Sequence, residues 1–197
     1  LLPVGARTLA AVAGAREAFD AVCGLCIPDP GQLALLNDKA ALAQLAQRLG
    51  IAVPQSFSPE LGESVAHFAA RAPLPCVVKP LCGEAFGLSA AQRYVIARTP
   101  QALEEAYTRF FALTNSAPVV QEYLPGAALG CSILAQDGRV VASIAHRRVR
   151  EYPVTGGPSS CCRVADETPL LRAVCALVRE TSFSGVAMFE FKCGQDG

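Results

Sequence analysis

The sequence is poor in charge and in histidine. Only 17% of its 197 residues are charged, the formal net charge is zero, and no block of basic residues occurs. Nucleic acid is therefore not expected as the main partner, because its phosphates are met by clustered lysines and arginines. The two histidines, His67 and His146, stand apart without a ligand partner at useful spacing. We assign neither of them a role.

Long apolar runs are also missing. None approaches the roughly 18 residues that a membrane span requires, so no membrane partner is expected. Residues 1–5 contain no methionine and lack the charged-then-apolar layout of a signal peptide. Hydrophobic residues nevertheless make up 52% of the chain, which is typical of a globular protein. We expect a cytoplasmic protein, and we interpret the sequence as a piece of a longer chain.

The cysteines do not form a convincing metal or disulfide pattern. There are nine of them, an odd number. Without a secretory signal, free thiols in a reducing compartment are the better interpretation. Cys23 and Cys26 form a single CxxC pair with no second pair at zinc spacing, and the adjacent Cys161 and Cys162 are an equally weak signal.

Helical and strand-like patterns alternate along the chain, which indicates an α/β protein. Helices are predicted over 8–22, 39–49, 60–71, 99–113 and 168–181. Strands are predicted over 74–80, 94–97, 119–124, 131–135, 140–145 and 185–192. Asp137 and Gly138 stand between two of these strands, and an Asp-Gly pair in that position predicts a tight β-hairpin.

Two lysines occupy unusual positions. Lys79 closes the short apolar strand 74–80, where ligands of α/β proteins gather, and burial of an unpaired ammonium is costly. The alternative is a lysine that reaches solvent along its apolar stem. Lys39 lies in the first turn of a helix, where the helix dipole disfavours a cation. That position favours an anion nearby, although a solvated side chain is the commoner case.

Glycines follow the Lys79 strand, and polar residues end the strand 119–124. Gly83 and Gly87 belong to a loop whose backbone amides suit an approach to phosphates, although the signal is weak. The second half of the strand 119–124 is too polar for a buried strand. We expect this half to leave the core or to line a site.

Charged residues gather in the last third of the chain. Arg147, Arg148 and Arg150 lead into a loop rich in glycine and serine at 155–160, and they form either a solvated hairpin edge or an anion clamp. Glu190 and Lys192 lie two residues apart on a strand and therefore share one face. A carboxylate there needs a cation, either Lys192 or a metal ion.

In order and spacing, these features resemble the ATP-grasp superfamily over nearly the whole chain. The matching segments are 38–39, 50–54, 75–80, 120–126, 137–138, 148–152, 156–160 and 185–192. Within the superfamily, the sequence most resembles the ligases related to carbamoyl-phosphate synthetase and biotin carboxylase. The resemblance implies an incomplete ATP-grasp fold of the α/β class with α+β subdomains. Residues 1–36 would be the tail of a pre-ATP-grasp domain, 37–120 the small lid subdomain with a leading helix, and 121–197 part of the large subdomain.

The same resemblance implies a site for ATP and Mg²⁺. Its cofactor-binding residues would be Lys39, Lys79, Gly83, Gly87, Gln121, Glu122, Tyr123 and Leu124; its metal ligand would be Glu190, and its catalytic residues Arg148 and Arg150. The lysines would hold the phosphates under a lid at 83–87, and 121–124 would grip the adenine edge. One of the two arginines would meet the carboxylate or acyl phosphate. Phosphoryl transfer depends on such positioning and charge neutralisation.

The implied activity is that of an ATP- and Mg-dependent ligase that activates a carboxylate as an acyl phosphate for attack by an amine. Its partners would be small-molecule carboxylates and amines, within a homodimer or a larger multidomain chain, and the piece itself is expected to be inactive. Phosphorylation of bicarbonate is one alternative. A non-catalytic nucleotide-binding module is another, because Leu129 stands where the family has an acidic ribose ligand and Glu84 lies near the phosphates. The family's second metal ligand, in a Glu-x-Asn motif, would fall past Gly197.

Overall fold

The computed structural model describes residues 1–3, 5–81, 86–89, 92–152, 157–166 and 168–194. The described helices are α1 (Ala6–Gly14), α2 (Arg16–Asp20), α3 (Pro30–Asn37), α4 (Lys39–Arg48), α5 (Val65–Arg71), α6 (Pro100–Thr114) and α7 (Thr168–Glu180). The described strands are β1 (Ser56–Phe57), β2 (Cys76–Lys79), β3 (Val95–Ala97), β4 (Val119–Glu122), β5 (Ala127–Gln136), β6 (Arg139–Glu151), β7 (Ser159–Val164) and β8 (Gly185–Cys193). They form two antiparallel four-stranded sheets. The predicted α/β class is confirmed.

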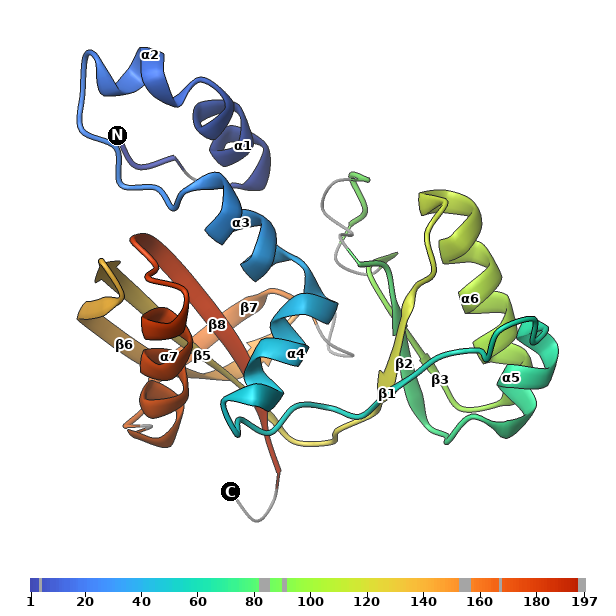
Figure 1. The fold of residues 1–197 in the computed structure, drawn as a ribbon. Helices are drawn as coiled ribbons and strands as arrows, with labels where there is room; N and C mark the ends of the chain where they lie inside the picture. The colour runs from blue at the N-terminus through green and yellow to red at the C-terminus, as the bar shows by residue number, and fades with distance from the viewer. Residues whose placement is uncertain (4, 82–85, 90–91, 153–156, 167, 195–197) are drawn as a thin grey trace.

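Sheet A has the strand order β1-β4-β2-β3 and is covered on one face by α5 and α6 (Figure 1). Successive residues of a strand point to opposite faces. Cys76 and Val78 of β2 are therefore fully buried in the core with Phe68 of α5 and Phe110 of α6. The intervening residues of β2, among them Lys79, point to the other face.

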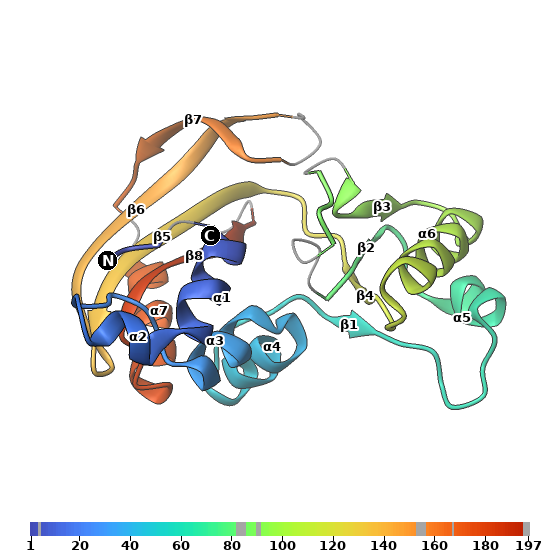
Figure 2. The same ribbon diagram turned by 90° about the horizontal axis from the view of Figure 1, so that it is seen from above.

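Sheet B has the order β7-β6-β5-β8 and forms a second core. Cys131, Ile133 and Ala135 of β5 pack against Val174, Leu177 and Val178 of α7 and against Leu45 and Ala46 of α4. The even-numbered residues of β5 turn to the opposite face. Figures 1 and 2 show the two sheets lying side by side, with α4 between them.

The predicted hairpin and the predicted helices over 39–49 and 99–113 are confirmed, as α4 and α6 for the helices. Asp137 (φ 49°) and Gly138 (φ 76°) form the two-residue turn between β5 and β6, and both have the positive φ of a type I′ turn. Asp38 caps α4 by accepting from the backbone N–H groups of Ala40 and Ala41 at 2.8 and 3.0 Å. Thr99 caps α6 in the same way.

Three local predictions are wrong. The single helix over 8–22 is divided at Ala15, which leaves the helical region (φ −117°, ψ 26°) directly after Gly14. The helix expected from 60 begins at Val65, because Gly62 adopts φ +79° and Ser64 is the N-cap. The strand expected over 119–124 ends at Glu122.

A helix and a strand were also missed. Helix α3 begins at Pro30, where Asp29 and Gln32 form a reciprocal capping box that the sequence signals but that was not predicted. Strand β7 takes in Ser159 and Ser160, which were expected to be loop. All six β7 residues are exposed, so no hydrophobic alternation announces the strand.

Within the described ranges, no helix is both long and apolar enough to cross a membrane. The described cysteines are all free thiols. Among the described side chains, no group of three or more histidine, cysteine, aspartate or glutamate residues is placed to hold a metal ion.

Candidate functional site

Two lysines meet where β2 ends. Lys79 is the last residue of β2 and is half-buried, and it has no hydrogen bond or ion pair with any described residue. Burial, and next the positive charge of Lys39, lower the pKa of Lys79 to about 8. Lys39 is the first residue of α4, and its Nζ donates to the carbonyl oxygen of Leu81. An anion at this point would relieve the repulsion between the two ammonium groups.

The reason for the position of Lys79 differs from the one expected. Because sheet A is antiparallel, the rule that ligands gather at the carboxyl ends of parallel strands does not apply to it. The alternation of β2 is what turns Lys79 away from α5 and α6. In both views of the fold, these helices lie on the side of sheet A remote from α4 (Figures 1 and 2).

The segment 121–124 includes the end of β4 in sheet A and the first residues of the connection to β5 in sheet B. Gln121 is only 6% exposed, and its Nε2 donates to Ser56 Oγ at 3.3 Å. The carboxylate of Glu122 accepts from the backbone N–H of Gln55 at 2.8 Å, so it closes the pairing of β1 with β4. The backbone N–H of Tyr123 donates to the Pro75 carbonyl at 3.2 Å, and Leu124 is 36% exposed.

Glu190 is paired with Arg148 rather than with Lys192, and this corrects one of the two expected partners. Lys192 or a metal ion was expected as its partner, but Lys192 donates to the carbonyl of Gly126 at 3.4 Å. Nη2 of Arg148, from β6, forms the ion pair with Oε1 of Glu190. In the register, Gly130 of β5 lies directly opposite Glu190, so the guanidinium of Arg148 reaches Glu190 across β5.

The guanidinium of Arg148 makes polar contacts besides the one with Glu190. Its side chain is 17% exposed, and Nη1 donates to the Gly157 carbonyl at 3.0 Å and to the Glu151 carboxylate at 3.4 Å. Its Nε is buried and has no hydrogen-bond partner in the described structure. A buried guanidinium nitrogen without a partner is costly and is a place for an acceptor atom to bind.

The two candidate arginines lie on opposite faces of sheet B. Arg148 pairs with Cys162 of β7, whereas Arg150 pairs with Cys161, with an irregularity in the strand between them. Because Cys161 and Cys162 are consecutive on their strand, they point to opposite faces. Arg148 therefore shares a face with Glu190, and Arg150 does not.

His146, which received no role from the sequence, lies on the face that carries Glu190. It is opposite Gly130, and a Cβ on that glycine would lie 2.5 Å from the imidazole Nε2. Gly130 thus has the imidazole on one side and the Glu190 strand on the other. A glycine inside a strand signals such a close approach, and this was the signal that could have found His146.

Leu129 does not point toward this face. It is 1% exposed, with the same parity as the core residues Cys131 and Ile133, whereas Ala128 pairs with Lys192 on the open face. An acidic side chain at position 129 would lie in the core, so Leu129 is not the counterpart of a ribose ligand. Gly83 and Glu84 lie outside the described residues. Gly87 is exposed in a turn with φ +66°.

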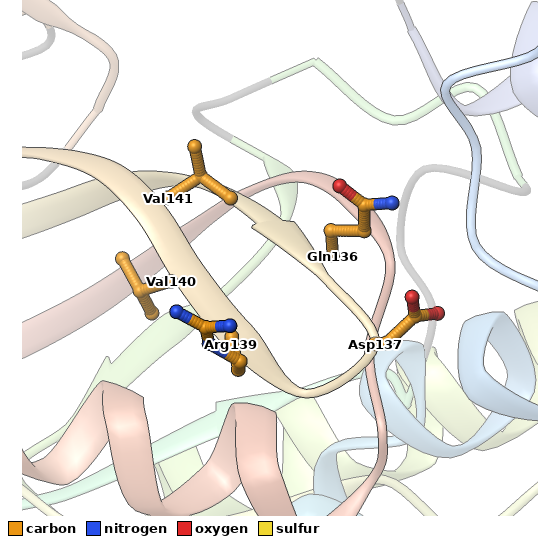
Figure 3. Close-up of a pocket in the computed structure, with 5 residues that line it drawn as sticks. All are labelled: Gln136, Asp137, Arg139, Val140 and Val141. Atoms are coloured by element: carbon orange, nitrogen blue, oxygen red, sulfur yellow. The ribbon is translucent and has the colours of Figure 1, made fainter.

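Two surface hollows among the described residues lie elsewhere. One of about 560 Å³ follows the β5–β6 turn and is lined by Gln136, Asp137, Arg139, Val140 and Val141. Figure 3 shows these side chains pointing in different directions rather than toward a common point. A smaller hollow of about 280 Å³ lies among α3, α4 and α7. Neither contains a candidate residue.

No protein-family profile and no curated protein sequence matches the chain. Solved structures do. The D-alanine-D-alanine ligase from Coxiella burnetii matches with a TM-score of 0.71 and 15% identity, over 94% of this chain and 51% of that one. The biotin carboxylase domain of 2-oxoglutarate carboxylase from Hydrogenobacter thermophilus, solved with MgADP and bicarbonate, gives 0.65 and 16%, over 98% and 45%.

A third match is the L-amino acid ligase from Bacillus licheniformis, with a TM-score of 0.63 and 17% identity over 93% of this chain and 42% of that one. The chain spans about half the length of these solved proteins. All three are ATP-grasp enzymes. This chain therefore has the ATP-grasp fold, as its sequence predicted.

Proposed function

We propose that this chain is the ATP-binding portion of an ATP- and Mg-dependent ligase. The observation that carries the proposal is the pair of Lys39 and Lys79, two neighbouring cations on an ATP-grasp fold. Lys79 has no acidic partner in the described structure, and a half-buried cation of this kind is suited to a polyanion. The triphosphate of ATP is such a polyanion.

In this proposal Lys39 and Lys79 hold the phosphates, and Gln121, Glu122, Tyr123 and Leu124 hold the adenine edge. Gln121 pairs with Val77 of β2 and therefore lies on the face of sheet A that carries Lys79, which supports its place beside the nucleotide. Gly83 and Gly87 belong to the loop proposed as the lid. The proposed subdomains remain 1–36, 37–120 and 121–197, although α4 packs in the sheet B core.

Glu190 fits a Mg²⁺ ligand. Its carboxylate supplies hard oxygen atoms, it is 57% exposed, and Mg²⁺ is commonly held by one or two carboxylates together with substrate phosphates. A bound Mg²⁺ would neutralise charge on the phosphates during transfer. The chain's own contribution is to present Glu190 on the same face as Arg148, whose fork suits a carboxylate or an acyl phosphate.

The proposed reaction has two steps. A carboxylate oxygen of the acceptor attacks the terminal phosphorus of ATP, and ADP leaves, which gives an acyl phosphate. An amine nitrogen then attacks the acyl carbon, phosphate leaves, and the nitrogen loses a proton as the C–N bond forms. Bicarbonate is the second candidate acceptor, because the match to a biotin carboxylase domain covers 98% of the chain. The whole protein would act on small-molecule carboxylates and amines.

Calorimetric titration with MgATP tests the nucleotide site. We expect binding by the wild-type chain and at least about a tenfold loss in Lys79→Met, because removing one desolvated charge contact costs roughly 1.5 kcal/mol or more. Arg172→Met, at an exposed position of α7, is the control with the same loss of one positive charge, and it should bind as the wild type does. Absence of binding by the folded wild-type chain would refute the proposal and favour a scaffold without nucleotide.

A further inference from the structure

Glu190 already has a cationic partner without any metal ion. The Arg148 guanidinium contacts Glu190 from β6, across the strand that carries Gly130. Arg148 is largely buried, whereas Glu190 is 57% exposed. The acid is therefore accessible to an ion from solvent, and the arginine is the group held in place by its surroundings.

Arg148 has anchors that do not depend on Glu190. Nη1 contacts the Gly157 carbonyl and the Glu151 carboxylate, and neither contact involves Glu190 or Nη2. Loss of the contact with Glu190 leaves Nη2 without its acceptor, and Nε already has none. The freed edge of the guanidinium then presents two donors in the geometry that matches a carboxylate or an acyl phosphate.

A divalent cation and a guanidinium compete at one carboxylate. Two positive groups within about 4 Å repel each other, and at a partly desolvated position this repulsion is weakly screened. Arg148 contacts only Oε1 of Glu190, so a cation that binds the carboxylate meets the guanidinium at close range, and the repulsion weakens the ion pair and lowers the affinity for the metal.

We infer that Glu190 is held in turn by Arg148 and by the divalent cation, so that metal binding frees Arg148 to receive the carboxylate acceptor. This inference rests on the proposed function and adds an order to it: the metal–nucleotide binds before the acceptor. Before the metal arrives, the Arg148 edge that would bind the acceptor is engaged by a carboxylate of the protein itself.

The first test measures the affinity for Mn²⁺ by electron paramagnetic resonance, with Mn²⁺ alone as the probe. Arg148→Met removes the competing cation and keeps an apolar stem. We expect it to tighten Mn²⁺ binding by about fivefold, the equivalent of one partly exposed ion pair. Arg163→Met is the matched control, because Arg163 is an exposed arginine of β7 opposite Arg147. It should leave the affinity nearly unchanged.

The second test follows Arg148 itself in the intact chain. Phenylglyoxal modifies accessible guanidinium groups, and mass spectrometry of the peptide that contains Arg148 reports the rate. We expect slow modification without metal, faster modification with MgADP, and fast modification without metal in Glu190→Gln. This readout does not depend on how well the Arg148 variant folds.

The inference is overturned if Arg148→Met and Arg163→Met have the same Mn²⁺ affinity, or if neither MgADP nor Glu190→Gln changes the modification rate of Arg148. The proposed function fails by a different result, namely MgATP binding that is absent or indifferent to Lys79→Met. Binding that depends on Lys79, together with an unchanged Arg148, would refute only the order of binding.

Discussion

Two charged residues show how neighbours set a pKa in this protein. Lys79 lies beside another cation, and burial together with Lys39 lowers its pKa to about 8. Glu63 lies beside Arg71, whose Nε and Nη2 donate to its carboxylate at 2.7 and 2.6 Å. These bonds are the main reason why the pKa of Glu63 falls to about 2. Lys79 thus lies near a like charge, whereas the carboxylate of Glu63 is paired with an opposite charge.

The Glu63 pair predicts a dependence of stability on pH. Because the folded pKa lies below the ordinary value of 4.5, the pair stabilises the fold above pH 4.5, and this contribution is lost as the pH falls toward 2. Glu63→Gln removes the titrating group. The difference in melting temperature between wild type and variant should therefore shrink from pH 6 to pH 2. A difference that stays constant over this range would contradict the assignment.

At the scale of elements, the sequence predicts correctly those helix starts and turns that depend on residues next to one another in the chain. The caps Asp38 and Thr99 begin α4 and α6, and Asp137–Gly138 turns the hairpin. Strand β7 has no such signal, because its residues are exposed and its pairing depends on a distant partner, β6. Hydrophobic residues recur at helical spacing over the whole of 8–22, but the helix is interrupted at Ala15 by a change in backbone dihedral angles. The spacing of side chains carries no information about such a change.

The candidate site likewise contains residues that local motifs predict and one contact that they do not predict. The resemblance anticipated Lys39 and Lys79 together, because both follow recognisable motifs. The pairing of Arg148 with Glu190 depends on the register of β6, β5 and β8, with irregularities after Arg148. A register shift of one residue would turn Arg148 to the other face, so no local pattern could have fixed this contact.

The connection from sheet A to sheet B contains a glycine that we predict cannot be replaced without loss of stability. Gly126 adopts φ +141°, and a Cβ there would fall on the backbone carbonyl of Cys193. Gly126→Ala should therefore lower the free energy of unfolding by about 3 kcal/mol or more, measured by urea denaturation. Gly24→Ala, where a Cβ meets no atom within 4 Å, serves as control and should change it little. Equal effects would show that the connection is not constrained.

At the scale of the whole molecule, the described residues form two separate cores. Sheet A packs with α5 and α6, and sheet B packs with α3, α4 and α7. The hydrogen bond from Lys39, at the start of α4, to the Leu81 carbonyl, just past β2, joins the two parts. The proposed phosphate site lies at this junction, so a bound nucleotide would hold the two cores in a fixed arrangement.

The measurement that tests this account most directly is the pKa of the Lys79 ammonium, by NMR of isotopically labelled lysine. The chain has only three lysines, Lys39, Lys79 and Lys192, so substitution assigns each signal. We predict a pKa of about 8 in the free chain, a higher value in Lys39→Met, and a rise on binding MgADP, because a bound anion favours the charged form. An ordinary pKa near 10.5 in the free chain, unchanged by MgADP, would contradict a phosphate site built on Lys39 and Lys79.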